Sequence, residues 1–228
     1  MNFHYTNLET CHEATGIVVV IDVLRAFSTA AYALSRGAEK IILVSDVNEA
    51  LSLKSQLPNS KAMGEVHGLP PEGFDFGNSP THILEQNLSG ITLIQRTSAG
   101  TQGVVHCKNA DVLLTSSFVV ASATAKNIRK LTPEAVTFVI TGQYAPEHGD
   151  EDLACAEYIE LSLKDQQPDG TPFIKRVFKS RDAIQHLDPK ETGFPLSDLD
   201  LCTKIDAFEF AMPITRENDI LVMRKSII

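Results

Sequence analysis

Residues 17–27 read IVVVIDVLRAF, an unbroken β-branched run that is followed by a carboxylate and then by a mostly apolar stretch. A continuous run of this kind is typical of a strand buried on both faces, as in a parallel sheet. Leu, Ala and Phe then recur at helical spacing from Val23 to Ser35, and Gly37 marks the end of that pattern. The stretch predicts a buried strand at 17–21, a turn at Asp22 and a helix, which is the first step of an α/β fold.

The same alternation of strand and helix patterns continues along the chain. Further strands are predicted at 40–44, 61–65, 91–95, 112–115 and 136–140, and further helices at 46–56, 79–87, 102–106, 119–130 and 152–163. We therefore expect an α/β protein with three layers, α/β/α, around a largely parallel sheet.

The pattern changes in the last third of the chain. After the turn cluster QQPDG at 166–170, helical patterns occupy 180–186 and 197–205, and we expect apolar runs at 208–212 and 220–223 to pair antiparallel. These last about 60 residues have few large apolar side chains and make a thin core of their own. We therefore expect one domain over 1–228, whose part 165–228 is a less regular α+β appendage.

Composition and charge exclude several classes of protein. The net charge of −9 argues against a nucleic-acid partner, because such proteins gather Lys and Arg on one face. The four cysteines are scattered without a CxxC pair and fit buried thiols of a cytosolic protein better than a zinc site or a disulfide framework. No signal-peptide pattern and no apolar stretch of about 20 residues is visible. We expect a cytoplasmic protein that does not bind membranes; enzymes of this class and size are often homodimers.

Polar residues gather where the predicted strands end. These residues are Asp22 with Arg25, Glu65, the loop RTSAGT at 96–101, and Thr141-Gly142-Gln143 followed by the acidic run at 150–152. Because ligands of open α/β sheets bind beyond the carboxyl ends of the strands, these groups are expected to converge on a site.

Each of these residues also has a purely structural interpretation. Asp22 can serve only as a helix N-cap, and the acidic run at 150–152 suits any first helical turn. A cation at a helix start is disfavoured by the helix dipole, so Arg25 is better explained as an anion ligand. His67 and His148 lack HxxxH spacing and are more typical of polar loops than of zinc ligands.

Several familiar catalytic patterns are absent. The segment VVVIDVLRAF starts like a phosphatase with a DxD motif, but Leu24 occupies the place of the second Asp. The chain has no GxxxxGK[ST] loop, no GxGxxG motif, no GxSxG elbow and no Cys-x5-Arg phosphatase loop.

Five motifs occur together in a recognisable order. They are IDVLRAFSTA at 21–30, GAEKIILVSDVNEAL at 37–51, GEVHG at 64–68 with GFDFGNSP at 73–80, RTSAGT at 96–101, and EDLACA at 151–156. Over most of 16–163 the chain resembles the 2-phosphosulfolactate phosphatase (ComB) family. The resemblance implies a family-specific α/β fold and Mg²⁺-dependent hydrolysis of (2R)-2-phospho-3-sulfolactate to 3-sulfolactate and phosphate, a step on a route to coenzyme M.

Two residues depart from the family motifs. Ala99 stands where the loop TxNGT has Asn, and Glu157 stands where EDxxCAG has Gly. The first change removes a side-chain amide that could donate to the substrate or brace the turn. The substrate can therefore be another small 2-phospho-hydroxyacid, and a non-catalytic anion-binding protein of the same fold is a further alternative.

Phosphate chemistry suggests roles for these residues. Mg²⁺ takes one or two carboxylates, so Asp22, Glu65 and Asp75 are candidate ligands. The planar fork of Arg25 suits phosphate or sulfonate oxygens. Further donors to the substrate are expected from Asn78, Ser79, Thr97, Ser98, Gly100 and Thr101.

Two alternatives remain for the identity of the nucleophile. A metal-bound water is favoured, with Asp152 or Glu151 as base or supporting group, and a phosphoenzyme on Asp22 is the other. Arg176, Lys179 and Arg181 in the last third of the chain either reach the site or are solvated, and solvation is the favoured alternative.

Overall fold

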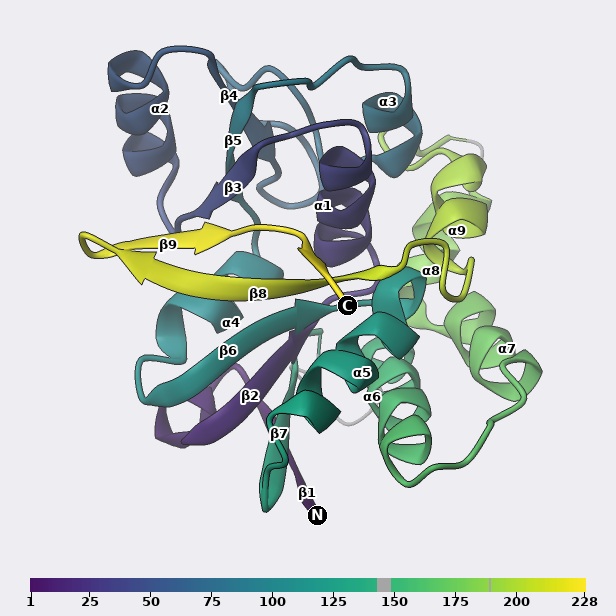
Figure 1. Cartoon of the computed structure of the whole chain (residues 1–228). Helices are drawn as coiled ribbons and strands as arrows, with labels where there is room; N and C mark the ends of the chain where they lie inside the picture. Colours follow the sequence, from purple (N-terminus) through teal and green to yellow (C-terminus); the bar gives the residue numbers. More distant parts are fainter. Residues whose placement is uncertain (143–148, 189) are drawn as a thin grey trace.

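A mixed sheet forms the centre of the computed structural model, which describes residues 1–142, 149–188 and 190–228. In the described part of the chain the sheet has ten strands, in the order β1-β7-β2-β6-β8-β9-β3-β5-β4, with β10 paired to β8 (Figure 1). The strands are β1 (Asn2–Asn7), β2 (Gly16–Ile21), β3 (Lys40–Leu43), β4 (Ser60–Gly64), β5 (Thr92–Arg96), β6 (Ala110–Ser116), β7 (Ala135–Ile140), β8 (Phe210–Glu217), β9 (Ile220–Met223) and β10 (Ser226–Ile227).

Helices cover both faces of this sheet. They are α1 (Ala26–Ser35), α2 (Val47–Gln56), α3 (Pro80–Leu84), α4 (Gly100–His106), α5 (Ala121–Lys130), α6 (Asp150–Leu163), α7 (Thr171–Lys179), α8 (Arg181–Leu187) and α9 (Leu196–Cys202), with short 3₁₀ turns η1 (Cys11–Glu13) and η2 (Phe118–Val120). The expected three-layer α/β/α fold with a mostly parallel sheet is confirmed. No helix in the described ranges has the length and apolar character needed to cross a bilayer.

Strand β2 is buried on both faces, as its sequence predicts. Val18 and Val20 pack in a core cluster with residues of α1 and α4. Val19 and Ile21 point the other way, into a cluster with residues of α5 and α6. A third cluster, around Ala50 of α2, covers the outer face of β3 and β5. A strand that supplies two cores needs apolar residues at every position, which explains the unbroken β-branched run.

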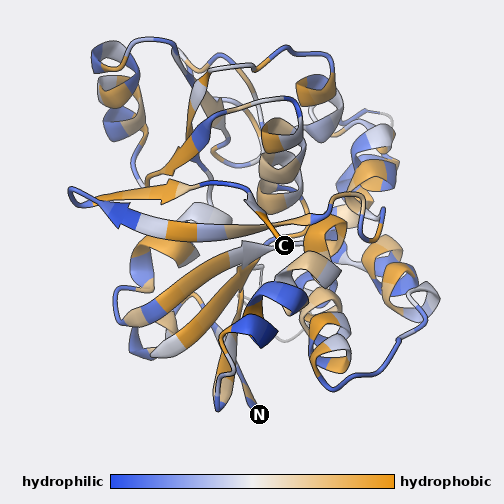
Figure 2. Ribbon diagram, in the orientation of Figure 1, coloured by the Kyte–Doolittle hydropathy of each residue, from blue (hydrophilic) through white to orange (hydrophobic). Residues whose placement is uncertain are grey.

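The C-terminal hairpin lies deeper in the fold than expected. The strands β1-β7-β2-β6 and β3-β5-β4 form two parallel groups, and β8 and β9 join them by antiparallel pairing to β6 and to β3. Figure 1 shows this hairpin crossing the middle of the sheet, and Figure 2 shows β9 as mainly hydrophobic with a hydrophilic hairpin tip. Phe210, Met212, Leu221 and Met223 of the hairpin lie in the same core cluster as residues of α1, so its core is shared and not its own.

Details of several elements also differ from the sequence prediction. Strand β1 and helix α7 were not predicted, and β9 pairs with 214–217 of β8, further along the chain than the expected 208–212. Helix α1 begins at Ala26 because residues 22–25 form a turn held by side chains of the cavity described below. All four cysteines are buried free thiols, as expected.

The position of β8 gives a direct test of its role in the core. Met212 of β8 is fully buried, so Met212→Ala should lower the free energy of unfolding by about 2–5 kcal/mol through lost contacts and a residual cavity. Ile227→Ala, at a side chain that is 75% exposed, is the control and should change it by less than about 0.5 kcal/mol. Urea denaturation measures both. Equal stability of the two variants would show that the hairpin is peripheral.

Candidate active site

The carboxyl ends of four parallel strands meet at one cavity of about 420 Å³. Its walls come from the loops after β2 (Asp22, Leu24, Arg25), β4 (Glu65, His67, Gly68), β5 (Ser98, Ala99) and β7 (Thr141, Gly142), from Asn78, from the start of α6 (Glu151, Asp152), and from the C-terminal segment (Arg181, Asp182, Gln185, His186, Phe194). The convergence predicted for the strand ends is therefore present. Of the predicted residues, Gln143 and His148 lie outside the described residues.

Asp22 is a buried carboxylate at the turn between β2 and α1. Its Oδ1 accepts a hydrogen bond from the Ala26 N–H at 2.8 Å, which starts the helix. A side chain at Gly100 would bring its Cβ within 2.7 Å of Asp22 Oδ2, so only glycine lets the loop after β5 approach this closely. Burial raises the pKa of Asp22 to about 7, and the charges of Glu65 and Asp182 add to the effect.

Asp152 connects the turn after β2 to the loop after β7. Its Oδ1 accepts from the Val23 N–H at 2.8 Å, and its Oδ2 accepts from the Gly142 N–H at 3.0 Å and the Thr141 hydroxyl at 3.2 Å. Burial, Glu151 and Asp22 hold its pKa well above the usual range. Since its hydrogen bonds hold two loops together, Asp152 orders the cavity wall.

Glu151 differs from its neighbour because one of its oxygens is not used by the protein. Oε2 is buried and has no hydrogen-bond partner among the described residues. Burial raises the pKa of Glu151 to about 8, with a further contribution from the charge of Asp182. A buried carboxylate oxygen without a partner is costly, and this one is available to a ligand in the cavity.

Glu65 anchors the RTSAGT loop. Its Oε1 accepts from the Ser98 N–H at 2.5 Å, and its Oε2 accepts from the Gly68 N–H at 2.7 Å and the Ser98 hydroxyl at 3.1 Å. Both carboxylate oxygens are therefore occupied by the loops that follow β4 and β5. This is a structural role, in addition to the role as metal ligand predicted from the sequence.

Most N–H and hydroxyl groups of the predicted phosphate-binding loop, RTSAGT at 96–101, already form hydrogen bonds within the protein. Thr97 and Thr101 are buried and bond each other, through the Thr97 N–H to Thr101 Oγ1 at 2.8 Å and the Thr101 N–H to Thr97 Oγ1 at 3.0 Å. The Ser98 N–H donates to Glu65, and Gly100 lies behind the cavity against Asp22. Only Ser98 and Ala99 of this loop line the cavity. A small loop satisfies its own donors when carboxylates and hydroxyls are close, and the sequence alone does not reveal that.

Arg25 is held by a carboxylate that sequence analysis missed. Its Nη1 donates to Asp198 Oδ2 at 2.8 Å and to the Gly193 carbonyl at 3.0 Å, and its guanidinium lies 4.5 Å from the centre of the Phe194 ring. Arg25 is 4% exposed and Asp198 is fully buried. The Leu24–Arg25 peptide bond is cis. Arg25 therefore lines the cavity, and its positive charge is balanced by the carboxylate of Asp198 on α9.

Two other predicted residues are turned away from the cavity. The Ser79 hydroxyl donates to Asp198 at 2.8 Å, so it supports the Arg25 pair instead of a substrate. Asp75 bonds Lys54 at 2.8 Å and accepts from the Ala62 N–H at 2.8 Å, so it does not lie with Asp22 and Glu65. The cause is that Phe76 pairs with Met63 and places Asp75 beside β4. Asn78, by contrast, lines the cavity, and its Oδ1 has no partner among the described residues.

The C-terminal segment supplies a wall that no sequence motif predicts. Arg181 is exposed, as expected, and it also lines the cavity, and Lys179 is exposed as expected. Arg176 pairs with Asp150 at 2.6 Å and with Glu157. The departure at Glu157 is thus explained, because its carboxylate joins α6 to α7.

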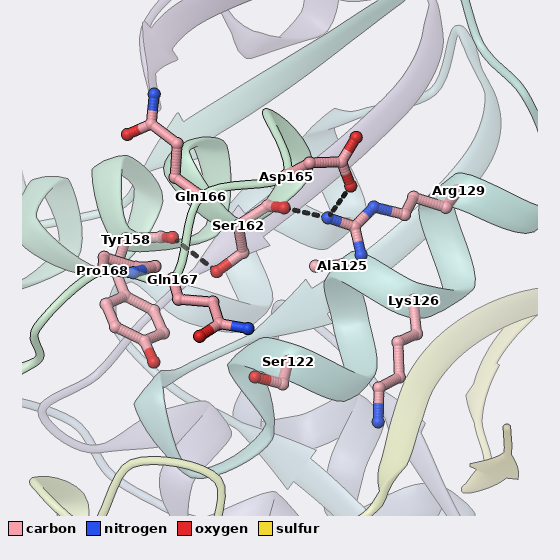
Figure 3. A pocket seen from close by; sticks show the side chains of 10 residues that line it. All are labelled: Ser122, Ala125, Lys126, Arg129, Tyr158, Ser162, Asp165, Gln166, Gln167 and Pro168. Carbon is pink, nitrogen blue, oxygen red and sulfur yellow. Dashed lines mark hydrogen bonds and ion pairs between the residues drawn. The ribbon is translucent and has the colours of Figure 1, made fainter.

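A second cavity, of about 320 Å³, lies over α5 and α6 (Figure 3). Arg129 in its wall donates to the Ser162 carbonyl and pairs with Asp165 at 2.9 Å. Ser122 bonds Asp206. These groups are already paired, and none of them follows the carboxyl end of a parallel strand. The cavity at the strand ends is therefore the candidate active site.

Comparison with known proteins agrees with this geometry. A family model described as 2-phosphosulpholactate phosphatase matches residues 3–217. The chain belongs to the 2-phosphosulpholactate phosphatase family.

Similar proteins in this family carry the name "Probable 2-phosphosulfolactate phosphatase". One from Bacillus subtilis (strain 168) is 33% identical over 213 residues, covering 93% of this chain and 92% of the relative. One from Carboxydothermus hydrogenoformans is 39% identical over 150 residues, covering 66% and 61%. One from Thermotoga maritima is 30% identical over 200 residues, covering 84% and 86%. That name describes a phosphoric monoester hydrolase, the class of enzyme predicted from the sequence.

Removing Asp198 tests the buried ion pair. Asp198→Ala leaves the Arg25 guanidinium buried without its carboxylate and should lower the free energy of unfolding by about 3–5 kcal/mol. The matched control is Glu217→Ala, which breaks the half-exposed pair with Arg224 and should cost much less than the loss of Asp198. Denaturant titration compares the two. A loss for Asp198→Ala no larger than that of the control would contradict the assigned role.

The raised pKa of Asp22 predicts a pH-dependent stability. The folded protein holds the proton up to a pH of about 7, whereas the unfolded chain releases it near pH 4, so stability falls as the pH rises through this window. Asp22→Asn keeps the acceptor for Ala26 but does not titrate, so its free energy of unfolding should fall less over the same range. Urea denaturation with a chelator present measures this. Parallel pH curves for wild type and variant would contradict the assignment.

Proposed function

We propose that this protein hydrolyses (2R)-2-phospho-3-sulfolactate to 3-sulfolactate and phosphate, as a step on a route to coenzyme M. The observation that carries the proposal is a family match over 3–217 combined with a cavity at the strand ends whose walls hold residues of the sequence motifs described above. A volume of about 420 Å³ suits one small organic phosphate.

The charge of the cavity supports a requirement for a cation. Its walls carry the carboxylates of Asp22, Glu65, Glu151, Asp152 and Asp182. The charge of Arg25 is already balanced by Asp198, and Arg181 adds one positive charge against these five acidic residues. Mutual repulsion contributes to the raised pKa values of Asp22, Glu151 and Asp152. A phosphate dianion would meet further repulsion here unless a bound cation offsets it.

Mg²⁺ fits this set of residues. Within the described residues, no three His, Cys, Asp or Glu side chains form a group that could hold a metal ion by themselves. Mg²⁺ needs only one or two protein carboxylates, because waters and substrate oxygens complete its shell. Asp22 and Glu151 would hold it, since Glu151 Oε2 has no other partner among the described residues. When bound, Mg²⁺ would neutralise charge on the phosphate oxygens.

The remaining residues of the wall have supporting roles in this proposal. Asp152 and Glu65 hold the loops that carry Asp22, Ser98 and Ala99 in place. Asn78 can bond the substrate through its unpartnered Oδ1 when a donor is present. Leu24 and Phe194 give the cavity an apolar surface that limits access of water.

Ala99 supports a second candidate substrate. Its side chain lies in the cavity wall where the family motif has Asn, and a methyl group offers no hydrogen bond. The enzyme can therefore act on another small 2-phospho-hydroxyacid whose acid group does not need that amide. Relative kcat/KM values over a panel of phosphorylated hydroxyacids distinguish the two.

A phosphate-release assay tests the function. Purified protein with Mg²⁺ and racemic phosphosulfolactate should release phosphate, and chelation should stop the release. Asp22→Asn should lower kcat by about 10²–10⁴-fold because a group at the reaction centre is lost.

The matched control for this assay is Asp75→Asn. Its carboxylate is bound to Lys54 away from the cavity, so kcat should stay within about threefold of wild type. Tight substrate binding without phosphate release would instead identify a non-catalytic anion-binding protein.

A further inference from the structure

His186 is a wall residue of the cavity that belongs to none of the sequence motifs. It lies on α8, which presents Asp182, Gln185 and His186 to the cavity at i, i+3 and i+4 spacing. The imidazole is 4% exposed. This wall comes from the C-terminal segment. Because the histidine is buried, the partners of its two ring nitrogens decide what it can do there.

One ring nitrogen is committed to the protein. Nδ1 lies 3.0 Å from the carbonyl oxygen of Pro195. A carbonyl oxygen only accepts, so Nδ1 must carry the proton. The ring also stands edge to face against Phe194, with centres 5.5 Å apart and planes at 88°. These two contacts set the tautomer and the orientation, and they leave Nε2 as the ring atom through which His186 can act on a bound molecule.

The charge state of the ring leaves a lone pair on Nε2. Burial lowers the pKa of His186, and the positive charge of Arg25 acts in the same direction. The Pro195 carbonyl, Asp198 on α9 and Asp182 on α8 act in the opposite direction and offset this in part. At neutral pH the imidazole is therefore neutral, with a proton on Nδ1 and an acceptor at Nε2.

Four of the five carboxylates in the cavity wall are poorer candidates for accepting a proton, since all but Asp182 are engaged in other roles. Both oxygens of Glu65 and both oxygens of Asp152 accept hydrogen bonds from loop N–H groups. Asp22 caps α1. With Asp22 and Glu151 assigned to the cation, His186 offers an acceptor whose orientation is fixed by two contacts and which no backbone N–H among the described residues engages.

We propose that His186 is the general base of the reaction. This inference rests on the proposed phosphatase function. As the oxygen of the attacking water bonds to phosphorus, one of its protons passes to Nε2. The bond between phosphorus and the ester oxygen breaks, and its electron pair goes to that oxygen, which takes a proton from solvent. The imidazolium then gives its proton to solvent, so the products are the hydroxyacid and hydrogen phosphate.

The decisive variant separates the two ring nitrogens. The amide of His186→Asn can still donate to the Pro195 carbonyl but has nothing at the position of Nε2. We expect its melting temperature to stay close to that of wild type and its kcat for phosphosulfolactate to fall by about 10²–10⁴-fold, with little change in KM. Added imidazole should restore part of the activity of His186→Ala, which a purely structural role would not allow.

The control is His12→Asn, at an exposed histidine far from the cavity, which should keep wild-type kinetics. If His186→Asn turns over at the wild-type rate, the proposal is overturned while the phosphatase function stands. If wild type itself releases no phosphate, the proposed function fails first. If His186→Asn does not fold, imidazole rescue of His186→Ala decides: recovery supports the base, and absence of recovery overturns it.

Discussion

The buried pair between Arg25 and Asp198 connects parts of the molecule that are far apart in the sequence. Arg25 follows β2, and Asp198 belongs to α9, whose neighbour α8 forms one wall of the cavity. Asp198 also accepts from the Ser79 hydroxyl and the Thr81 N–H, which orders the start of α3 beside Asn78. A buried charge pair is stable only when its remaining hydrogen bonds are satisfied. The Asp198 carboxylate therefore fixes three segments relative to one another: the turn after β2, the start of α3 and its own helix α9.

Most carboxylates of the site act in a similar way, by holding backbone N–H groups. Glu65 joins the loops after β4 and β5, and Asp152 joins the turn after β2 to the end of β7. Loops at the ends of parallel strands leave many donors unpaired, and each buried acceptor satisfies two or more of them. The negative charge gathered for this structural purpose then favours a cation in the cavity, so order in the loops and affinity for a metal have the same origin.

The sequence predicts much of this arrangement, and its limits have a physical cause. The apolar run at 17–21 and the polar residues that follow it predicted a buried strand with Asp22 at the cavity, because strand burial depends on local pattern. Asp75, Ser79 and Thr97 were expected at the site but bond other groups of the protein. Their partners, such as Lys54 and Asp198, are set by tertiary contacts. His186 and Asp198 lie on helices that the sequence predicts, but no motif marks them, because tertiary contacts alone bring them to the site.

The central position of β8 and β9 has a consequence for the synthesis of the chain. These strands come later in the chain than every strand of the two parallel groups, yet they fill the gap between those groups. Pairing of Thr115 with Met212 spans almost half the chain, and contacts of this range form slowly. A growing chain therefore carries two half-sheets with open edges, and the sheet becomes continuous only once β8 and β9 have been synthesised. Until then, those unpaired edges are exposed to pairing with a neighbouring chain.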